Sequence, residues 1–244
     1  IYKTFKDKKY LYLVMEYMPG GDLMNLFIKK DVLSEEESKF YIAEILIAIE
    51  YMHKMNYIHR DLKPSNICID SNNKLYLIDF GLSRINIINN THIIEPKIHS
   101  LIGSINFSSL NVLNLIEPAQ RDDVESILYI LSYLLLSKEN YTIYDSIADI
   151  EKKNIDLFLI FLQDKTNIIL NNIAINYLLV GKLFKYVRRL KYNQKPNYEY
   201  IIQLIIFWVY FGIHCNIRLF EFTRVFRKNL IQGIHVEKRF CSCI

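Results

Sequence analysis

Cysteine and glycine are both scarce in this sequence, and each shortage excludes a class of site. Four cysteines and six histidines are spread over 244 residues without the regular spacing of a metal site. Thiols this sparse are typical of a reducing compartment, so we predict an intracellular, cytoplasmic protein. The seven glycines include no G-x-G-x-x-G pattern, so these residues lack one common loop that covers nucleotide phosphates.

Strong charge and long apolar runs are also missing. The net charge is only +4, which gives little support for a polyanionic partner, and we predict no nucleic-acid partner. The most apolar stretch, residues 201–213, is about a dozen residues long, whereas a membrane-spanning helix needs roughly 20. We therefore predict a buried core helix there and no membrane partner; a membrane segment and aberrant sequence are the alternatives.

The first third of the chain carries clear signals for a strand and two helices. Residues 10–15 form a continuous apolar and aromatic run, which predicts a buried strand. Asp22 is a plausible N-cap for a helix over residues 23–30. Ser34 and Glu37 form a capping box that opens a long helix. The apolar positions of that helix recur at helical spacing: Ile42, Ile45, Leu46, Ile49 and Met52.

The remainder of the chain is predicted to be mostly helical. Residues 67–69 and 75–78 are two short strands joined by a polar turn, and residues 82–104 are polar and irregular. Residues 123–136 are apolar on nearly every helical face, which predicts a helix in the centre of a domain. A further helix is expected over residues 183–192. Arg188 and Arg189 are predicted to lie on its solvent side, and Lys195-Pro196 to end it.

Two short motifs carry most of the functional information. Residues 59–66 read His-Arg-Asp-Leu-Lys-Pro-Ser-Asn, and residues 79–81 read Asp-Phe-Gly. The first fits the H-R-D-L-x-x-x-N catalytic loop and the second fits the D-F-G metal loop. The strand, turn and strand between them would let both acidic loops face one phosphate. In both motifs the chain resembles the catalytic domain of eukaryotic protein kinases.

This resemblance implies an α+β, protein-kinase-like fold in which a small β-rich lobe and a larger helical lobe hold ATP between them. We expect a mostly α-helical C-lobe with only the last strands of the N-lobe. A partial kinase domain is expected over residues 1–204, with the end of the N-lobe and the hinge at 1–17 and the C-lobe at 18–204. Residues 205–244 would be a divergent extension. Ile1 in place of methionine favours a fragment.

The resemblance also implies roles for four catalytic residues and for the metal ligand Asp79, with ATP and Mg²⁺ as cofactors. Asp61 would orient the substrate hydroxyl and accept its proton, and Lys63 would offset charge on the transferring phosphoryl group. Asn66 and Asp79 would hold magnesium, a cation that prefers oxygen ligands. Ser104 would contact the catalytic aspartate and lysine.

Residues of the hinge and of the neighbouring strand would bind the nucleotide. Met15 would be the gatekeeper, while the Glu16 carbonyl and the Met18 N–H would pair with the adenine edge. Asp22 would lie near the ribose, although a plain N-cap is an equal alternative. Leu23 and Cys68 would line the apolar floor, although for Cys68 a small buried apolar residue is the preferred interpretation.

Two more residues would organise the catalytic loop in such kinases. Asp123, at the start of the predicted central helix, would brace the backbone of the loop. Arg60 would pair with a phosphate on the activation segment.

The subgroup resemblance changes along the chain. Residues 2–70 resemble the AGC group, especially its NDR-type members, through the words at 12–22. Residues 77–204 are more similar to the casein kinase 1 group, through Ser-Leu-Asn at 109–111 and Arg-Asp-Asp-Val-Glu-Ser at 121–126. Both groups phosphorylate Ser or Thr, so the reaction class is the same.

The resemblance predicts a Ser/Thr protein kinase domain that transfers the γ-phosphate of Mg-ATP to hydroxyls of a protein substrate. No V-A-I-K lysine and no partner-helix glutamate precede the hinge, so this chain should be weak or inactive by itself. A pseudokinase or interaction module that acts by binding is the alternative from another class. A small-molecule or lipid kinase is disfavoured by residues 109–111 and 121–123. The oligomeric state is left open.

Overall fold

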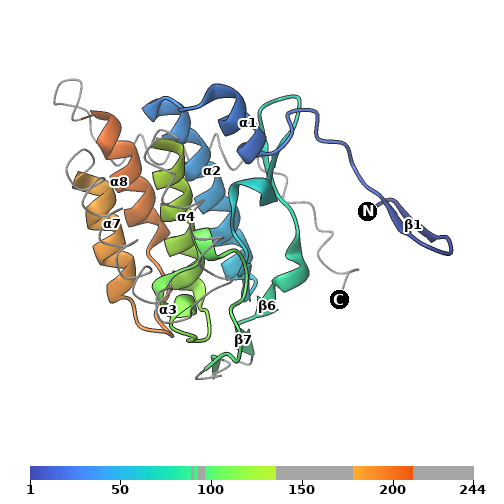
Figure 1. Cartoon of the computed structure of the whole chain (residues 1–244). Coiled ribbons are helices and arrows are strands. Elements are labelled where there is room, and N and C mark those ends of the chain that lie inside the picture. The colour runs from blue at the N-terminus through green and yellow to red at the C-terminus, as the bar shows by residue number, and fades with distance from the viewer. Residues whose placement is uncertain (89–90, 93–96, 136–177, 211–244) are drawn as a thin grey trace, which may run out of the picture.

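A helical body and a separate β-hairpin make up the described part of the chain (Figure 1). The computed structural model describes residues 1–88, 91–92, 97–135 and 178–210. The helices are α1 (Leu23–Lys30), α2 (Glu35–Lys54), α3 (Leu110–Leu113), α4 (Gln120–Leu135), α7 (Leu178–Arg189) and α8 (Tyr198–Tyr210), with short 3-10 turns η1 (Pro64–Asn66), η2 (Phe80–Leu82) and η3 (Ile105–Phe107).

Eight short strands pair in four antiparallel two-stranded sheets within the described residues. The strands are β1 (Lys3–Lys6), β2 (Leu11–Val14), β3 (Tyr57–Ile58), β4 (Ile67–Ile69), β5 (Leu75–Leu77), β6 (Arg84–Ile85), β7 (Ile87–Ile88) and β8 (Thr91–His92). The pairs are β1 with β2, β3 with β6, β4 with β5, and β7 with β8. The predicted strands at 67–69 and 75–78 are confirmed, while the segment at 82–104, expected to be irregular, contains three two-residue strands.

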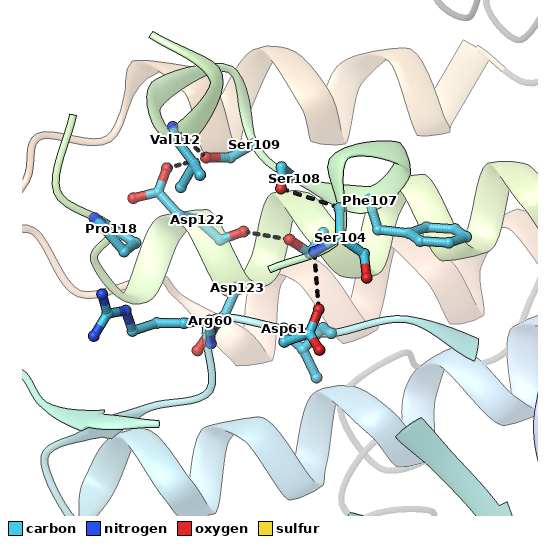
Figure 2. A pocket seen from close by; sticks show the side chains of 12 residues that line it. Arg60, Asp61, Ser104, Phe107, Ser108, Ser109, Val112, Pro118, Asp122 and Asp123 are labelled. Atoms are coloured by element: carbon cyan, nitrogen blue, oxygen red, sulfur yellow. Dashed lines mark hydrogen bonds between the residues drawn. The ribbon is translucent and has the colours of Figure 1, made fainter. Parts of the chain in front are cut away.

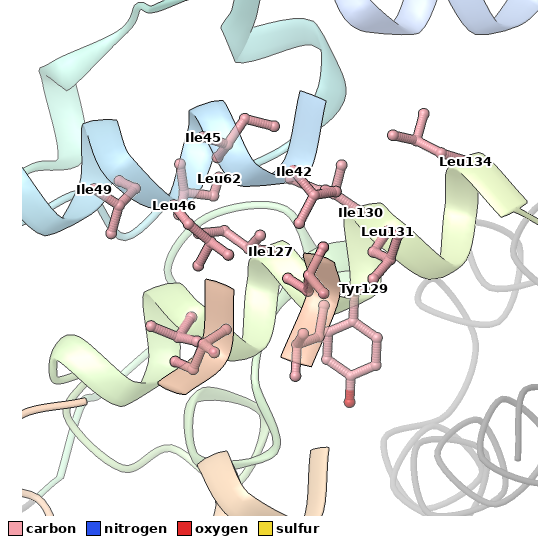
Figure 3. Packing of buried hydrophobic residues seen from close by; sticks show 14 of the residues in the cluster. Ile42, Ile45, Leu46, Ile49, Leu62, Ile127, Tyr129, Ile130, Leu131 and Leu134 are labelled. Carbon is pink, nitrogen blue, oxygen red and sulfur yellow. The ribbon is translucent and has the colours of Figure 1, made fainter. Parts of the chain in front are cut away.

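The core lies between α2 and the helices that pack on it, α4 and α8. Ser34 caps α2 and forms the predicted box with Glu37, in which each side chain meets the other residue's backbone N–H. The predicted apolar face of α2 is fully buried against α4, as Figure 3 shows for Ile42, Leu46 and Ile127. Local capping and periodicity therefore predicted this helix and its buried face correctly.

Helix α4 runs through the centre of the body, as its apolar pattern predicted. It begins at Gln120, three residues before the predicted start, and all of its residues except Arg121 and Tyr133 are buried. The early start matters because it adds Asp122 to the helix and places it with Asp123 in the first turn, where both carboxylates point to neighbouring loops.

The prediction of a buried strand at residues 10–15 is wrong in its burial. Strand β2 forms and pairs with β1, but Leu11 is 65% exposed and Leu13 is 48% exposed. The hairpin extends away from the helical body (Figure 1). A strand that is apolar on both faces needs cover on both faces, and in the described part of the chain this hairpin has none.

Helix α7 corrects two further predictions. It spans Leu178–Arg189 rather than 183–192, and Arg188 is partly buried, with 20% of its side chain exposed, whereas Arg189 is exposed as predicted. The Arg188 guanidinium is 3.0 Å from the carboxylate of Glu125, which is buried in α4. The first part of the apolar stretch predicted at 201–213 contributes Ile201 and Ile205 to the core, as predicted. Residues 211–213 of that stretch lie outside the described residues.

None of the described helices is long and apolar enough to cross a membrane. The greater part of the predicted extension at 205–244 lies outside the described residues, because residues 211–244 are not among them.

Candidate active site

Asp61 lies at the centre of a group of polar side chains between β3 and η1. The chain leaves β3 through Arg60, whose φ of 73° turns the backbone sharply. Asp61 is only 6% exposed. Its carboxylate accepts hydrogen bonds from Lys63 Nζ at 2.7 Å, from the Ser104 backbone N–H at 2.9 Å and from Asn66 Nδ2 at 3.2 Å. The other three predicted catalytic residues are thus in direct contact with Asp61.

These donors keep the Asp61 carboxyl ionised. Burial by itself raises its pKa, but the hydrogen bond and charge of Lys63 and the hydrogen bonds from Ser104 outweigh burial, and the pKa falls below its ordinary value. A buried carboxylate held in this way can accept a proton from a hydroxyl group and is not already protonated near neutral pH.

The hairpin of β4 and β5 brings the two predicted magnesium ligands near each other. Asn66 immediately precedes β4, and its carbonyl accepts the Ile78 N–H at 3.0 Å. Asp79 follows directly, with a left-handed φ of 62°, and its side chain is exposed. The Asn66 Nδ2 also donates to the Asp61 carbonyl at 2.9 Å, which leaves its amide oxygen for another partner.

The donor set around this hairpin fits magnesium better than a transition metal. The described residues hold no cluster of three or more His, Cys, Asp or Glu that could bind a metal. Magnesium needs fewer protein ligands, because it usually combines one or two carboxylates with substrate phosphates and water. Asp79 and the Asn66 amide oxygen supply such a minimal oxygen set.

His59 connects the two loops and is a residue whose own role the sequence reasoning did not single out. It is fully buried, its Nε2 lies 3.2 Å from the Ile78 carbonyl, and its ring lies 5.4 Å from that of Phe80. Burial lowers the pKa of His59, so the ring is neutral. Its position inside the motif at 59–66 was the signal that could have identified it.

Asp123 braces the catalytic loop, as the resemblance implied. Its two carboxylate oxygens accept the backbone N–H groups of His59 at 2.7 Å and of Arg60 at 2.9 Å. His53 Nε2 lies 2.8 Å from the first of these oxygens. Burial alone would raise the pKa of Asp123, but these partners hold it below its ordinary value, so the side chain is a carboxylate.

A small pocket separates Asp61 from the start of α4 (Figure 2). Ser104 and Asp61 both line this pocket, and the Ser104 N–H donates to the Asp61 carboxylate. The preceding residue, Gly103, has a φ of 80° and lies close to the Arg60 carbonyl. A Cβ on Gly103 would lie 2.4 Å from that carbonyl oxygen. Only glycine allows this close approach.

The segment Ser-Leu-Asn at 109–111 is tied to α4 through Asp122. The Ser109 hydroxyl donates to Asp122 Oδ1 at 2.6 Å, and Asn111 Nδ2 donates to the same oxygen at 2.9 Å. Burial raises the pKa of Asp122, against the effect of these donors. An amide at position 111 therefore suits an acidic partner, where a glutamate would repel it.

The hinge residues are not brought into contact with the Asp61 group by the described part of the chain. Met15 is 59% exposed, Glu16 is also exposed, and Met18 is half-buried. Their exposure follows from that of the β1–β2 hairpin, because nothing described covers the strand that leads into them.

The remaining predicted nucleotide residues lie where the hinge joins the body. The Asp22 side chain caps α1 by accepting the Asn25 N–H at 2.7 Å, so the N-cap interpretation is confirmed. Cys68 pairs with Asp22 in a single β-bridge, and burial raises the pKa of its thiol. Leu23 has no exposed surface at all. Leu23 therefore packs in the core, because α1 turns it inward, and it offers no surface to a nucleotide.

Arg60 has a carboxylate partner where the resemblance implied a phosphate. Its guanidinium lies 3.9 Å from Glu117, and Arg84 lies 3.3 Å from the same oxygen. Glu117 is only 3% exposed. Sequence reasoning missed Glu117 because no motif includes it.

Comparisons with known proteins agree with this geometry. Residues 1–173 match the family described as Protein kinase domain. Over 83 residues the chain is 55% identical to the serine/threonine-protein kinase CBK1 of Pneumocystis carinii, a match that covers 34% of this chain and 16% of the relative.

Two further relatives give similar figures. The serine/threonine-protein kinase cot-1 of Neurospora crassa is 52% identical over 83 residues, which is 34% of this chain and 14% of the relative. The serine/threonine-protein kinase tricornered of Drosophila pseudoobscura pseudoobscura is 52% identical over 82 residues, which is 34% of this chain and 18% of the relative. The chain thus spans less than a fifth of each of these relatives. These relatives support the likeness to NDR-type kinases, and with the family match they show that the chain belongs to the protein kinase family.

Proposed function

We propose that this chain carries the catalytic centre of a Ser/Thr protein kinase, which transfers the γ-phosphate of Mg-ATP to a Ser or Thr hydroxyl of a protein substrate. The observation that carries the proposal is the hydrogen-bonded group around Asp61. Lys63, Asn66 and Ser104 all donate to one buried carboxylate, and Asp123 fixes the loop that presents it.

Each residue of this group has a defined task in phosphoryl transfer, which depends mainly on positioning and on charge stabilisation. Asp61 orients the substrate hydroxyl and takes its proton. Lys63, at 2.7 Å from Asp61, offsets the negative charge that spreads over the transferred group. Asn66 and Asp79 hold magnesium, which when bound neutralises charge on the phosphate oxygens.

The domain boundaries are part of the same proposal. Residues 1–17 would be the end of the small lobe and the hinge, residues 18–204 the large lobe, and residues 205–244 an extension. The exposed β1–β2 hairpin supports this, because its two apolar faces suit a strand from a larger sheet. The 244 residues include no glycine-rich phosphate loop. We therefore expect weak transfer from this chain by itself.

The two parts of the chain resemble different groups of protein kinases. The identities with NDR-type relatives support the AGC likeness in the first part. The pairing of Asn111 with Asp122 supports the casein kinase 1 likeness in the second part, because it gives the Ser-Leu-Asn segment a structural partner. Both likenesses predict that a Ser or Thr hydroxyl accepts the phosphate.

The test is a phosphate-transfer assay on protein expressed from the complete gene. Asp61→Asn should lower the transfer rate by roughly 100-fold or more, the usual effect of losing a general base. Asp31→Asn is the matched control, since Asp31 is an exposed residue at the end of α1 and the change is the same carboxylate-to-amide replacement. Absence of Mg-ATP-dependent transfer, or an Asp61→Asn rate equal to that of the control, would overturn the proposal.

A binding module without catalysis is the second candidate. It is favoured by the exposure of the hinge, where Met15 is 59% exposed and Tyr17 is 83% exposed. Thermal unfolding with and without Mg-ATP separates the two on the same protein. A catalytic domain should be stabilised by nucleotide only when magnesium is present, whereas a binding module should not respond.

A further inference from the structure

A tyrosine on the last described helix reaches the catalytic loop through a buried histidine. The hydroxyl of Tyr198, at the start of α8, is hydrogen-bonded to Nδ1 of His53 near the end of α2. The other ring nitrogen of His53 lies 2.8 Å from Asp123. Tyr198 is 7% exposed and His53 and Asp123 are each 3% exposed, so water does not compete for these contacts.

The direction of each hydrogen bond follows from the two ends of this series. Asp123 is a carboxylate and can only accept, so His53 Nε2 must donate to it. Burial, followed by the charge of Asp123, raises the pKa of Tyr198 well above 10, so its hydroxyl keeps its proton. An imidazole with its single proton on Nε2 has a bare Nδ1, which can only accept, so in this tautomer the Tyr198 hydroxyl donates to His53 Nδ1.

The position of the Asp123 carboxylate depends on His53, because the histidine is one of the three donors that hold its two oxygens. One oxygen accepts both His53 Nε2 and the His59 N–H, and the other accepts the Arg60 N–H. A rotated imidazole would withdraw one of these donors. It would also free the carboxylate to move away from the backbone immediately before Asp61.

We propose that Tyr198 is a positioning residue for the catalytic loop: its hydroxyl fixes the tautomer and orientation of His53, which holds Asp123 against the backbone of His59 and Arg60. The expected effect on the transfer rate rests on the proposed function. The hydrogen-bond arrangement of Tyr198, His53 and Asp123 can be tested whether or not the chain is active. Through His53 and Asp123, helix α8 would therefore contribute to the position of Asp61.

The ring of Tyr198 and its hydroxyl can be tested separately. The ring packs edge-on against His53, with centroids 5.9 Å apart, and Tyr198→Phe keeps this contact while it removes only the oxygen. Tyr200→Phe is the matched control, because it makes the same change on the same helix at a side chain that is 39% exposed.

Two measurements on the 244-residue chain test the hydrogen-bond arrangement of Tyr198, His53 and Asp123. Nitrogen-15 NMR of the unmodified chain should show His53 with a protonated Nε2 and a bare Nδ1, a reading that needs no variant to fold. Hydrogen exchange at the His59 and Arg60 amides should be about tenfold faster in Tyr198→Phe, as expected for the loss of one buried hydrogen bond. It should be unchanged in Tyr200→Phe. A proton on Nδ1, or equal exchange in both variants, would overturn the inference.

Kinetics of the protein expressed from the complete gene supply the functional readout. Tyr198→Phe should lower kcat by about tenfold and leave the KM for Mg-ATP within about twofold, since the hydroxyl places the loop and touches no substrate. A rise in KM with unchanged kcat would contradict the positioning role. If the unmodified protein transfers no phosphate, the proposed function fails, and the exchange and NMR results still decide the inference.

Discussion

At the scale of single residues, Asp61 is defined by its donors and by the backbone that carries them. Lys63 and Asn66 come from the same loop and could be assigned from the motif alone. The third donor, the Ser104 N–H, is distant in sequence and depends on the conformation of Gly103. Glu117, the partner of Arg60, could not be predicted, because a lone glutamate outside any motif carries no signal of its tertiary contact.

Replacing Gly103 by alanine tests this dependence. The new Cβ would meet the Arg60 carbonyl at 2.4 Å in a left-handed backbone, so both a clash and a conformational cost arise. We expect Gly103→Ala to lower the free energy of unfolding by about 2–4 kcal/mol, measured by urea denaturation.

Gly21→Ala is the control for Gly103→Ala. Gly21 has a similar φ of 71° but open space at its Cα. Gly21→Ala should therefore lower the free energy of unfolding only by the conformational cost of a left-handed alanine, roughly 1–2 kcal/mol. Equal costs for the two variants would show that the close approach at Arg60 does not exist.

At the scale of elements, helices whose signals are local were predicted well, and contacts between elements were not. The Ser34–Glu37 box and the apolar face of α2 lie within one segment of sequence, and both are confirmed. The exposure of β2 was missed because a strand's burial depends on what covers it. Arg188 was misplaced because an arginine can turn inward when a buried carboxylate meets it.

The ion pair between α7 and α4 gives a prediction at this scale. Arg188→Met should destabilise the protein by about 3–5 kcal/mol, because Glu125, 1% exposed, loses its charged partner. Arg189→Met, one residue away and exposed, should change stability by less than about 0.5 kcal/mol. Chemical denaturation measures both, and comparable effects would contradict the inward placement of Arg188.

A pair of leucine truncations tests the contrast between the hairpin and the body. Leu46→Ala removes a side chain with no exposed surface and should cost about 2–5 kcal/mol. Leu13→Ala on β2, where the side chain is 48% exposed, should cost less than about 0.5 kcal/mol in the 244-residue chain. A large cost at Leu13 in thermal unfolding would mean that the hairpin is covered.

At the scale of the whole molecule, several helices of the body together position the residues of the candidate site. Helix α4 supplies Asp122 and Asp123, α2 supplies His53, and α8 supplies Tyr198. The α+β kinase-like architecture and the family could be predicted from the two motifs. The network that joins α8 to the catalytic loop could not, because its members are far apart in sequence and belong to no common pattern.

The most direct test of the account is whether Asp61 and Lys63 act as one unit. Single-turnover phosphate transfer is measured for the complete-gene protein, Asp61→Asn, Lys63→Met and the double variant. Residues that serve one transition state are strongly non-additive, so the double variant should be about as slow as the slower single variant. Losses that multiply, as for independent sites, would contradict the claim that the two form one catalytic centre.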